Sequence, residues 1–424
     1  MRPVLTPQEM ARADARAIAA GTPETVLIER AAAAVARHAL RMLAGPYGAL
    51  LLADMGAEVI KIEEPDGGDP IRGMGPPFLP DGESAYFLAI NRNKKSVAID
   101  LTKEAGREVF HDLVRRADVV LENFRPGVME RLGCGYAKLW ALNQRIVLCS
   151  ISAYGQEGPY REWPAFDLAL QAMGGAMSLT GEPGREPVRM GLPMGDLAGG
   201  VFGAFAVAGA LWRRERTGEG AHIDLSLLDC QVSLLTYLAQ YFWADGRVPG
   251  PLGSAHASVV PYGALATGDG HLIVAVFVEK FWSGFCRALG RPQWERDPRF
   301  LTNRDRVVNR ETLMPLVEAE FRTRTTAEWL RRLQAEGVPA APIQSVDRVL
   351  EDLQVRRRGM VVEVEHPVHG RLPTLGTPVK VDGAMTVTVS PPPRLGEHTD
   401  PVLRELLKYP DARIAELRRA GVIR

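Results

Sequence analysis

The chain has 424 residues, and its 51 Lys and Arg are balanced by 51 Asp and Glu. This length is enough for two domains with a large core, and 46% hydrophobic residues is ordinary for a globular protein. The zero net charge argues against a nucleic-acid or polyanion binder but leaves room for one local basic pocket. No window reaches the roughly 18 uninterrupted apolar residues of a membrane span. We therefore expect a cytoplasmic protein without membrane or nucleic-acid partners.

The four cysteines are widely spaced and form no CxxC pair. A disulfide framework or a structural zinc site is therefore not expected, and buried reduced thiols are the default. The eight histidines add no familiar metal-binding motif, so the sequence predicts no metal cofactor. The cysteines are Cys134, Cys149, Cys230 and Cys286.

Residues 44–225 alternate short apolar strands with helices. This alternation is typical of an α/β domain with a parallel, doubly wound sheet of the Rossmann-like kind. We expect strands at 57–62, 118–121, 146–151 and 222–225, and helices at 50–55 and 104–116.

The second half of the chain begins with an apolar helical run, 225–243, that predicts a connector packed against a partner. A Gly- and Pro-rich stretch then marks a domain boundary. The following residues predict a smaller α+β unit, and the tail returns to strands (360–365 and 385–389) and helices. The predicted divisions are a helical N-terminal segment 1–43, a large domain 44–225, a linker helix 226–253, a small domain 254–345 and a C-terminal return 346–424 to the large domain.

One carboxylate, Asp196, lies between Gly195 and Gly199 just before the long apolar segment 201–212. Glycine on both sides lets the backbone approach a bulky ligand. If the apolar run is a helix, its first N–H groups and dipole would favour an anionic group or a developing oxyanion there. A carboxylate so placed can be a nucleophile that carries an acyl group. The alternative for a Gly-Asp pair is a turn or a helix cap.

Short motifs in a fixed order flank this carboxylate. From about residue 44 to the C-terminus they resemble the class III CoA-transferases, the CaiB/BaiF family of formyl-CoA and carnitine type. The resemblance implies acyl-CoA and carboxylic-acid substrates, with Asp196 as the nucleophile that forms a covalent aspartyl intermediate. It also implies two chains threaded together as an interlocked homodimer, and it leaves the donor and acceptor acids open. The motifs are at 51–63, 68–72, 91–100, 122–127, 216–220, 297–300, 337–342 and 395–399.

The same resemblance implies a CoA-binding segment at Asn123, Phe124 and Arg125, with Arg131 following. Two arginines beside a strand end suit the diphosphate and 3′-phosphate of CoA as charge-assisted, bidentate donors. The alternative is a solvated loop and a cation in the first turn of a helix.

Three more positions match the edge of the family's CoA site, namely Ala44, Ile99 and Asp100. Thr102 stands where the family often has a lysine, which puts that phosphate contact in doubt. Leu43 stands where formyl-CoA transferases have a glutamine, and their glycine-rich flap is lacking. These two departures argue against a specialisation for oxalate or formate.

Two residues beside the nucleophile are catalytic candidates by the same resemblance. Tyr86 matches an aromatic position near the acyl group, although an aromatic residue in an apolar stretch is often part of a core. Asp167 matches an acidic position that either steers the chemistry by charge or caps a helix. The related α-methylacyl-CoA racemases share most of these motifs but carry a histidine base where this chain has Phe166. A racemase-like isomerase is therefore the less favoured, alternative function. His256 is a loop histidine that either contacts the acceptor acid or is incidental.

The first 43 residues are similar to the opening helices of NAD(P)H-hydrate epimerases, with Thr6 and Glu9 as a capping box. Class III transferases instead open with a strand and turn. We therefore expect the first strand of the sheet to be missing or replaced by helix, which allows a further alternative, a catalytically impaired family member.

Overall fold

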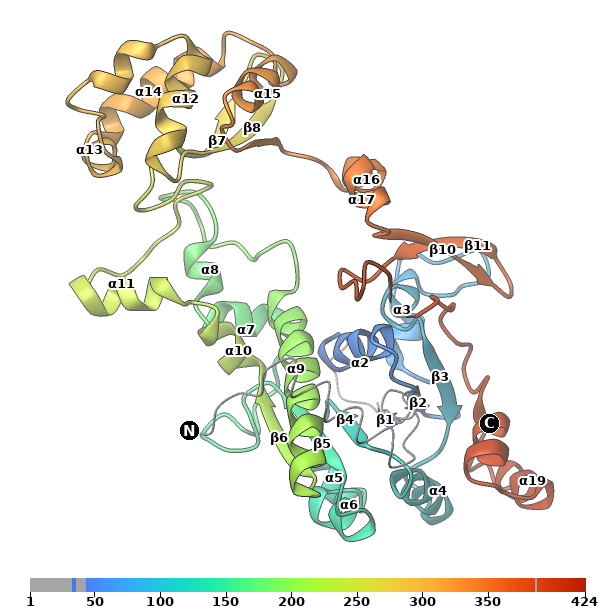
Figure 1. Cartoon of the computed structure of the whole chain (residues 1–424). Helices are drawn as coiled ribbons and strands as arrows, with labels where there is room; N and C mark the ends of the chain where they lie inside the picture. Colours follow the sequence, from blue (N-terminus) through green and yellow to red (C-terminus); the bar gives the residue numbers. More distant parts are fainter. Residues whose placement is uncertain (1–32, 36–42, 386) are drawn as a thin grey trace. The chain divides into compact units, whose positions relative to one another are not determined.

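The computed structural model describes residues 33–35, 43–385 and 387–424. These residues form a mixed α/β chain of two compact units (Figure 1). The first unit runs to Ala176 and also contains Arg189–Ala239 and Arg356–Arg424. The second contains Met177–Val188 and Gln240–Val355. Most of the predicted helix and strand segments are present, with bounds that differ by a few residues.

A six-stranded, fully parallel sheet in the order β3-β2-β1-β4-β5-β6 organises the first unit. Strands β2, β4 and β5 are buried along their length, as is usual for a sheet with both faces covered. The strands are β1 (Ala33–Val35), β2 (Val59–Glu63), β3 (Lys94–Ala98), β4 (Val119–Glu122), β5 (Val147–Ser152) and β6 (Ala221–Ser226).

The centre of this sheet corrects one sequence prediction. Ala33–Val35 forms β1 and pairs in parallel with both β2 and β4. The expectation that the opening strand is missing or helical is therefore wrong at these three residues. Alanine favours helix as an isolated residue, but hydrogen bonding to two neighbouring strands outweighs that weak preference. The predicted helices and capping box at 4–32 lie outside the described residues.

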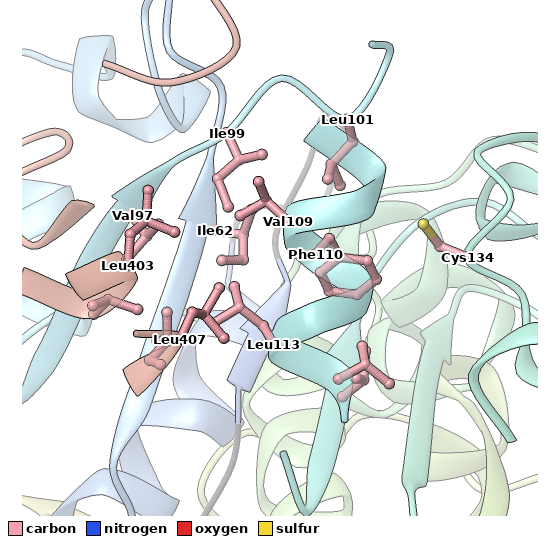
Figure 2. Close-up of a cluster of buried hydrophobic side chains, with 14 of the residues drawn as sticks. Ile62, Val97, Ile99, Leu101, Val109, Phe110, Leu113, Cys134, Leu403 and Leu407 are labelled. Carbon is pink, nitrogen blue, oxygen red and sulfur yellow. The ribbon is translucent and has the colours of Figure 1, made fainter. Parts of the chain in front are cut away.

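Helices pack on this sheet around two main apolar clusters. One cluster joins β2, β3 and α4 (Glu104–Val114) to the C-terminal segment through side chains that include Ile62, Val97, Phe110 and Leu403 (Figure 2). Burial of the apolar face of α4 in this cluster helps to hold the C-terminal segment against the sheet. The other helices of the first unit are α2 (Ala44–Asp54), η1 (Pro70–Gly73), α3 (Ala85–Ile90), α5 (Val128–Arg131), α6 (Tyr136–Leu142), α7 (Asp167–Met173), α9 (Met194–Thr217), α10 (Leu227–Ser233), α18 (Thr399–Pro401), η3 (Val402–Leu406) and α19 (Asp411–Arg419).

The longest helix, α9, has 24 residues and is apolar enough to cross a membrane by length and composition alone. Its Val207 is 1% exposed and belongs to the cluster that covers β4 and β5. Its early glycines also pack directly against α2. We therefore interpret α9 as a core helix of the first unit.

The second unit has its own sheet and core. An antiparallel sheet in the order β7-β8-β9 lies beside helices whose core includes Trp282, Phe285, Phe321 and Trp329. Trp329 also donates its indole N–H to the carbonyl of Phe321 at 2.7 Å, which satisfies a buried donor. Its elements are β7 (Tyr262–Ala266), β8 (His271–Ala275), α12 (Glu279–Leu289), η2 (Pro292–Arg296), α13 (Asn303–Val308), α14 (Arg310–Phe321), α15 (Thr326–Ala335), β9 (Ala340–Pro342) and α16 (Val346–Glu351).

Three of the four boundaries between the units fall within helices, namely α8 (Ala176–Leu179), α11 (Tyr237–Asp245) and α17 (Leu353–Arg357), and the fourth, between Val188 and Arg189, lies outside helices and strands. The linker helix predicted at 226–253 is not continuous. It consists of two helices, α10 and α11, separated by a turn that includes Thr236, a residue with a positive φ of 44°. The tail forms the hairpin β10 (Val361–His366) and β11 (Gly370–Leu375). The strand predicted at 385–389 is not formed by its described residues.

Candidate active site

The N-terminus of α9 holds the carboxylate on which the sequence analysis centres. Asp196 is the third residue of this helix and is 9% exposed. The helix has no side-chain cap at Pro193. Instead, Oδ1 of Asp167 accepts the backbone N–H groups of Gly195 at 2.8 Å and of Asp196 at 3.2 Å. The anion at this helix end is therefore the Asp167 side chain. It occupies N–H groups that the sequence pattern had suggested for an anionic ligand or an oxyanion.

A glutamine fixes the orientation of this capping carboxylate. Gln171, one turn along α7, donates from Nε2 to Oδ2 of Asp167 at 2.7 Å. Its Oε1 accepts the backbone N–H of Met190 at 2.9 Å. Both oxygens of Asp167 thus have partners, and the carboxylate has little freedom to rotate.

A second glutamine lies against the same turn and was missed by sequence reasoning. Gln231 on α10 is 3% exposed, and its Nε2 has no hydrogen-bond partner among the described residues. A Cβ on Gly195 would lie 2.8 Å from this nitrogen and 2.9 Å from Oδ1 of Asp167. Any side chain at residue 195 would therefore have to displace Gln231 or Asp167. No local sequence signal singled out Gln231, because Asp229 and Ser233 are also polar residues of α10.

Two helices cross backbone to backbone beside the candidate nucleophile. A Cβ on Gly200 would lie 3.0 Å from the carbonyl oxygen of Ala44 and 2.8 Å from the ring of Tyr47. A Cβ on Gly48 would lie 3.0 Å from the carbonyl oxygen of Gly200. This contact brings Ala44, at the start of α2, next to the first turns of α9.

Asn123, directly after β4, joins the start of α2 to the sheet. Its Oδ1 accepts the backbone N–H of Gly45 at 3.3 Å, and its Nδ2 donates to the carbonyl of Ile151 at 2.7 Å. The side chain is 8% exposed. It therefore holds together the carboxyl ends of β4 and β5 and the N-terminus of α2, the edge of a parallel sheet where ligands usually bind.

Tyr86 on α3 completes the group around Asp196. It is half-buried and packs in the small apolar cluster that also contains Leu197. Burial and the charges of Asp196 and Asp167 raise the pKa of Tyr86 to about 12. The phenol therefore keeps its proton at neutral pH and can donate a hydrogen bond.

Other positions matched to the CoA site have side chains that face the core. Phe124 is 2% exposed and Ile99 is fully buried, so only their backbones could meet a ligand. The N–H of Ile99 donates to the carbonyl of Glu63, and that of Asp100 to the carbonyl of Val422, both at 2.8 Å. The Asp100 carboxylate accepts the N–H of Thr102 at 2.9 Å. These backbone donors are thus already used by the fold.

Unlike Phe124 and Ile99, the two predicted phosphate-binding arginines have exposed side chains. Arg125 follows β4, Arg131 ends α5, and neither guanidinium forms an ion pair with a residue in the described part of the chain. Nη1 of Arg131 and Nη2 of Arg161 lie 3.3 and 3.9 Å from the point that a Cβ on Gly127 would take. Arg161, which sequence reasoning did not single out, therefore adds a third positive charge close to Arg131. Nε of Arg161 forms an ion pair with the adjacent, exposed Glu162 at 3.2 Å.

Two remaining candidates have different positions. Phe166 is 48% exposed and precedes α7, where it offers no base. His256 belongs to the second unit, where its Nδ1 accepts the N–H of Ser258 at 3.1 Å. The four cysteines are free and buried, as predicted.

Comparison with known proteins identifies the family. The sequence profile of "CoA-transferase family III" matches residues 38–399. The chain belongs to this family. It is therefore a CoA-transferase that uses CoA thioesters, as the sequence motifs predicted.

Individual family III relatives match over most of their length. The mouse succinyl-CoA:glutarate CoA-transferase is 39% identical, with 90% of this chain and 88% of the relative covered. The succinate–glutarate CoA-transferase of Agrobacterium fabrum is 38% identical, covering 86% of this chain and 93% of the relative. The crystal structure of a CaiB/BaiF family protein from Brucella suis superposes with a TM-score of 0.78 at 39% identity, covering 89% of this chain and 98% of that one.

Proposed function

We propose that this transferase moves CoA from an acyl-CoA donor to a free carboxylic acid through a covalent intermediate on Asp196. One observation carries the proposal: the carboxylates of Asp196 and Asp167 and the protonated phenol of Tyr86 meet at the buried N-terminus of α9. Removal from water matters here, because a mixed anhydride would otherwise hydrolyse.

The proposed reaction has two halves. An Asp196 oxygen attacks the thioester carbonyl, the C–S bond breaks, and CoA thiolate leaves a mixed anhydride behind. The thiolate then attacks the aspartyl carbonyl, which expels the donor acid as a carboxylate and leaves an aspartyl-CoA thioester. The acceptor carboxylate repeats these steps in reverse order, so acyl-CoA leaves and the Asp196 carboxylate is restored.

We assign Tyr86 and Asp167 distinct roles in this scheme. Tyr86, protonated at neutral pH, donates a hydrogen bond to an acyl or carboxylate oxygen at the reacting carbon. Asp167 holds the first turn of α9, and its negative charge steers the anionic carboxylate and thiolate groups that react beside it. Both residues act without exchanging protons with the substrate.

The dicarboxylates succinate and glutarate are the substrates we favour, because the two enzymes compared above are named for them. Their second carboxylate gives the enzyme a charge to recognise at the far end of the acid. Leu43 at the start of α2 is 6% exposed and supplies no hydrogen-bond donor from its side chain.

The proposed site for CoA is the carboxyl edge of the sheet. We propose that Arg125 and Arg131 bind its phosphates and that Ala44, Asn123 and the backbones of 99–100 and 124 line the remainder of the site. The strand order around β1 and β4 is that of Rossmann-like nucleotide-binding sheets, in which ligands bind at the strand ends where the order reverses.

We also propose the assembly and location that the family resemblance implied. Exposed apolar side chains on α9, with Phe205 at 75% and Trp212 at 67%, are suited to cover by a second chain of an interlocked homodimer. In this assignment the boundaries between the large and the small domain lie at the linker 226–253 and near residue 346. We assign the enzyme to the cytoplasm.

The direct test is a matrix of donors and acceptors. Succinyl-CoA and acetyl-CoA would be incubated with glutarate, succinate, oxalate and acetate, and the new thioesters would be separated by chromatography. We expect the succinyl-CoA and glutarate pair to give the largest kcat/KM. Loss of an α-hydrogen to deuterated solvent without any acceptor would instead support the racemase alternative. Absence of both activities, with no CoA binding at millimolar ligand, would support an impaired chain.

A further inference from the structure

Two histidines and two carboxylates meet between the β10–β11 hairpin and the loop before α3. His366 ends β10, and His369 lies in the hairpin turn. Asp81 and Glu83 belong to the loop that Ser84 closes by capping α3. All four residues belong to the first structural unit. No step of the proposed transfer reaction uses them.

Their distances match ligands around a common centre. Nε2 of His369 lies 3.0 Å from Oδ1 of Asp81 and 3.7 Å from Oε2 of Glu83. Nε2 of His366 lies 3.3 Å from the same Glu83 oxygen. Ligands held about 2.0–2.1 Å from a tetrahedral ion are about 3.3 Å from one another. One ligand atom from each of Glu83, His366 and His369 lies within 4.8 Å of the other two.

Hydrogen bonds do not account for this arrangement. The Nε2 atoms of both histidines are buried and have no hydrogen-bond partner among the described residues, although carboxylate oxygens are near. The His366 side chain is fully buried and that of His369 is 11% exposed. Orphaned buried nitrogens of this kind require an explanation. A carboxylate that lies near a ring nitrogen but off its N–H direction is expected where both atoms face the same ion.

We propose that Glu83, His366 and His369 bind a divalent transition-metal ion of the zinc class, and that the exposed Asp81 turns toward the ion from beside His369 as the fourth ligand. Two imidazoles and two carboxylates form a ligand set that zinc accepts. Magnesium and calcium prefer oxygen ligands alone, and two imidazoles disfavour them. The site lies outside the sequence prediction, because its two halves are far apart in the chain and neither carries a familiar zinc motif.

Metal binding requires one local change in the hairpin turn. Nδ1 of His366 accepts the backbone N–H groups of Val368 and His369, both at 3.3 Å. A ring that coordinates through Nε2 keeps its proton on Nδ1, so these two long contacts open when the ion binds. The exposed turn residues 367 and 368 absorb this movement, while β10 and β11 keep their pairing.

The metal would act on the active site through the start of α3. The Ser84 hydroxyl accepts the N–H of Phe87 at 3.3 Å and donates to the carbonyl of Met74 at 2.5 Å. Glu83 is the residue before this cap, and Tyr86 lies in the first turn after it. An ion that joins Glu83 to the hairpin therefore fixes the N-terminus of the helix that carries Tyr86. The ion has a structural role and takes no part in the transfer of CoA.

The test uses full-length protein without a histidine tag, freed of metal with a chelating resin. Zinc would be titrated by calorimetry, and bound metal would be counted by mass spectrometry after desalting. We expect about one zinc per chain with a micromolar or lower Kd, together with a higher thermal midpoint. His369→Gln and Glu83→Gln should each weaken zinc binding by at least about tenfold. The control His271→Gln, an exposed residue of β8, should leave zinc binding unchanged.

Three results would overturn the proposal: less than about a tenth of an equivalent of zinc, unchanged binding in both His369→Gln and Glu83→Gln, or equal loss in the His271 control. If one variant fails to fold, Asp81→Asn provides the same comparison from an exposed ligand. Each of these outcomes is independent of CoA transfer, which is measured separately on the same samples.

Discussion

The two ends of the proposed active site differ in how far the fold has prepared them. At the start of α9, Asp167 has partners on both carboxylate oxygens, and Asp196 is nearly buried. At the end of β4, by contrast, Arg125 and Arg131 are exposed and form no ion pair within the described ranges 43–385 and 387–424. The end of the site at α9 is therefore rigid before any ligand binds. At the end with the arginines, mainly the backbone is held in place.

This difference follows from what each end must do. Covalent transfer requires the attacking oxygen and its neighbours to be positioned before the reaction, because reorganisation would add to the barrier. Binding a phosphate needs charge and reach, and flexible arginines can close on it after contact. The rigid end should therefore control kcat, and the exposed end should control affinity for CoA and its dependence on salt.

Removal of the nucleophile should give the largest effect. Asp196→Asn keeps the shape of the side chain but abolishes acyl transfer, with a loss of at least about 1,000-fold in kcat. The affinity for CoA should stay within about tenfold, since the arginines are untouched. Asp229→Asn, in the first turn of α10, is the matched control and should retain activity. Residual turnover of Asp196→Asn above a few per cent would disprove its role as the nucleophile.

Changes at the exposed end should affect binding rather than chemistry. Arg125→Ala and Arg131→Ala should each weaken CoA binding by about 1.5–3 kcal/mol, as for a lost charged hydrogen bond. The penalty should shrink with dephospho-CoA for whichever arginine holds the 3′-phosphate, and with rising salt. Titration calorimetry measures both effects. Arg116→Ala, which changes another exposed arginine, is the control. Equal CoA affinities in all three variants would show that Arg125 and Arg131 belong to a solvated loop that does not bind CoA.

Two substitutions of Asp167 separate its cap from its charge. Asp167→Ala removes the acceptor for two N–H groups of α9 and should cost about 1–2 kcal/mol in the free energy of unfolding. Asp167→Asn keeps one oxygen for the two N–H groups of α9 but turns its amide NH2 toward the Nε2 donor of Gln171, so it should restore only part of that stability and lower kcat by about tenfold or more. Urea unfolding and steady-state kinetics provide the two measurements. If kcat is normal in the Asn variant, Asp167 is only a cap.

The two glutamines beside the rigid end should show the smallest contrast. Gln171→Met leaves an Asp167 oxygen and the N–H of Met190 without their partner, so it should cost about 2 kcal/mol in the free energy of unfolding. Gln231→Met removes an amide nitrogen that has no hydrogen-bond partner in the described part of the chain, so it should cost less than about 0.5 kcal/mol. A large loss of kcat in stable Gln231→Met would show that this nitrogen meets the substrate instead.

Local patterns in the sequence predicted the parallel sheet and the place of Asp196 at the start of a long helix, because strand length and glycine spacing are local properties. They failed where distant segments decide the structure. Ala33–Val35 is extended because β2 and β4 lie on either side of it. Asp167 caps α9 rather than the helix that it begins, and Gln231 comes from a third helix. No single stretch of sequence contains such contacts, so the candidate residues were predicted more completely than their partners.

The covalent aspartyl intermediate is the central claim, and it can be trapped. Enzyme incubated with succinyl-CoA would be treated with hydroxylamine or borohydride, digested and examined by mass spectrometry. We predict one modified peptide, with the label on Asp196, and no label when succinyl-CoA is omitted or in Asp196→Asn. A label on another residue, or turnover in the absence of any label, would contradict the account.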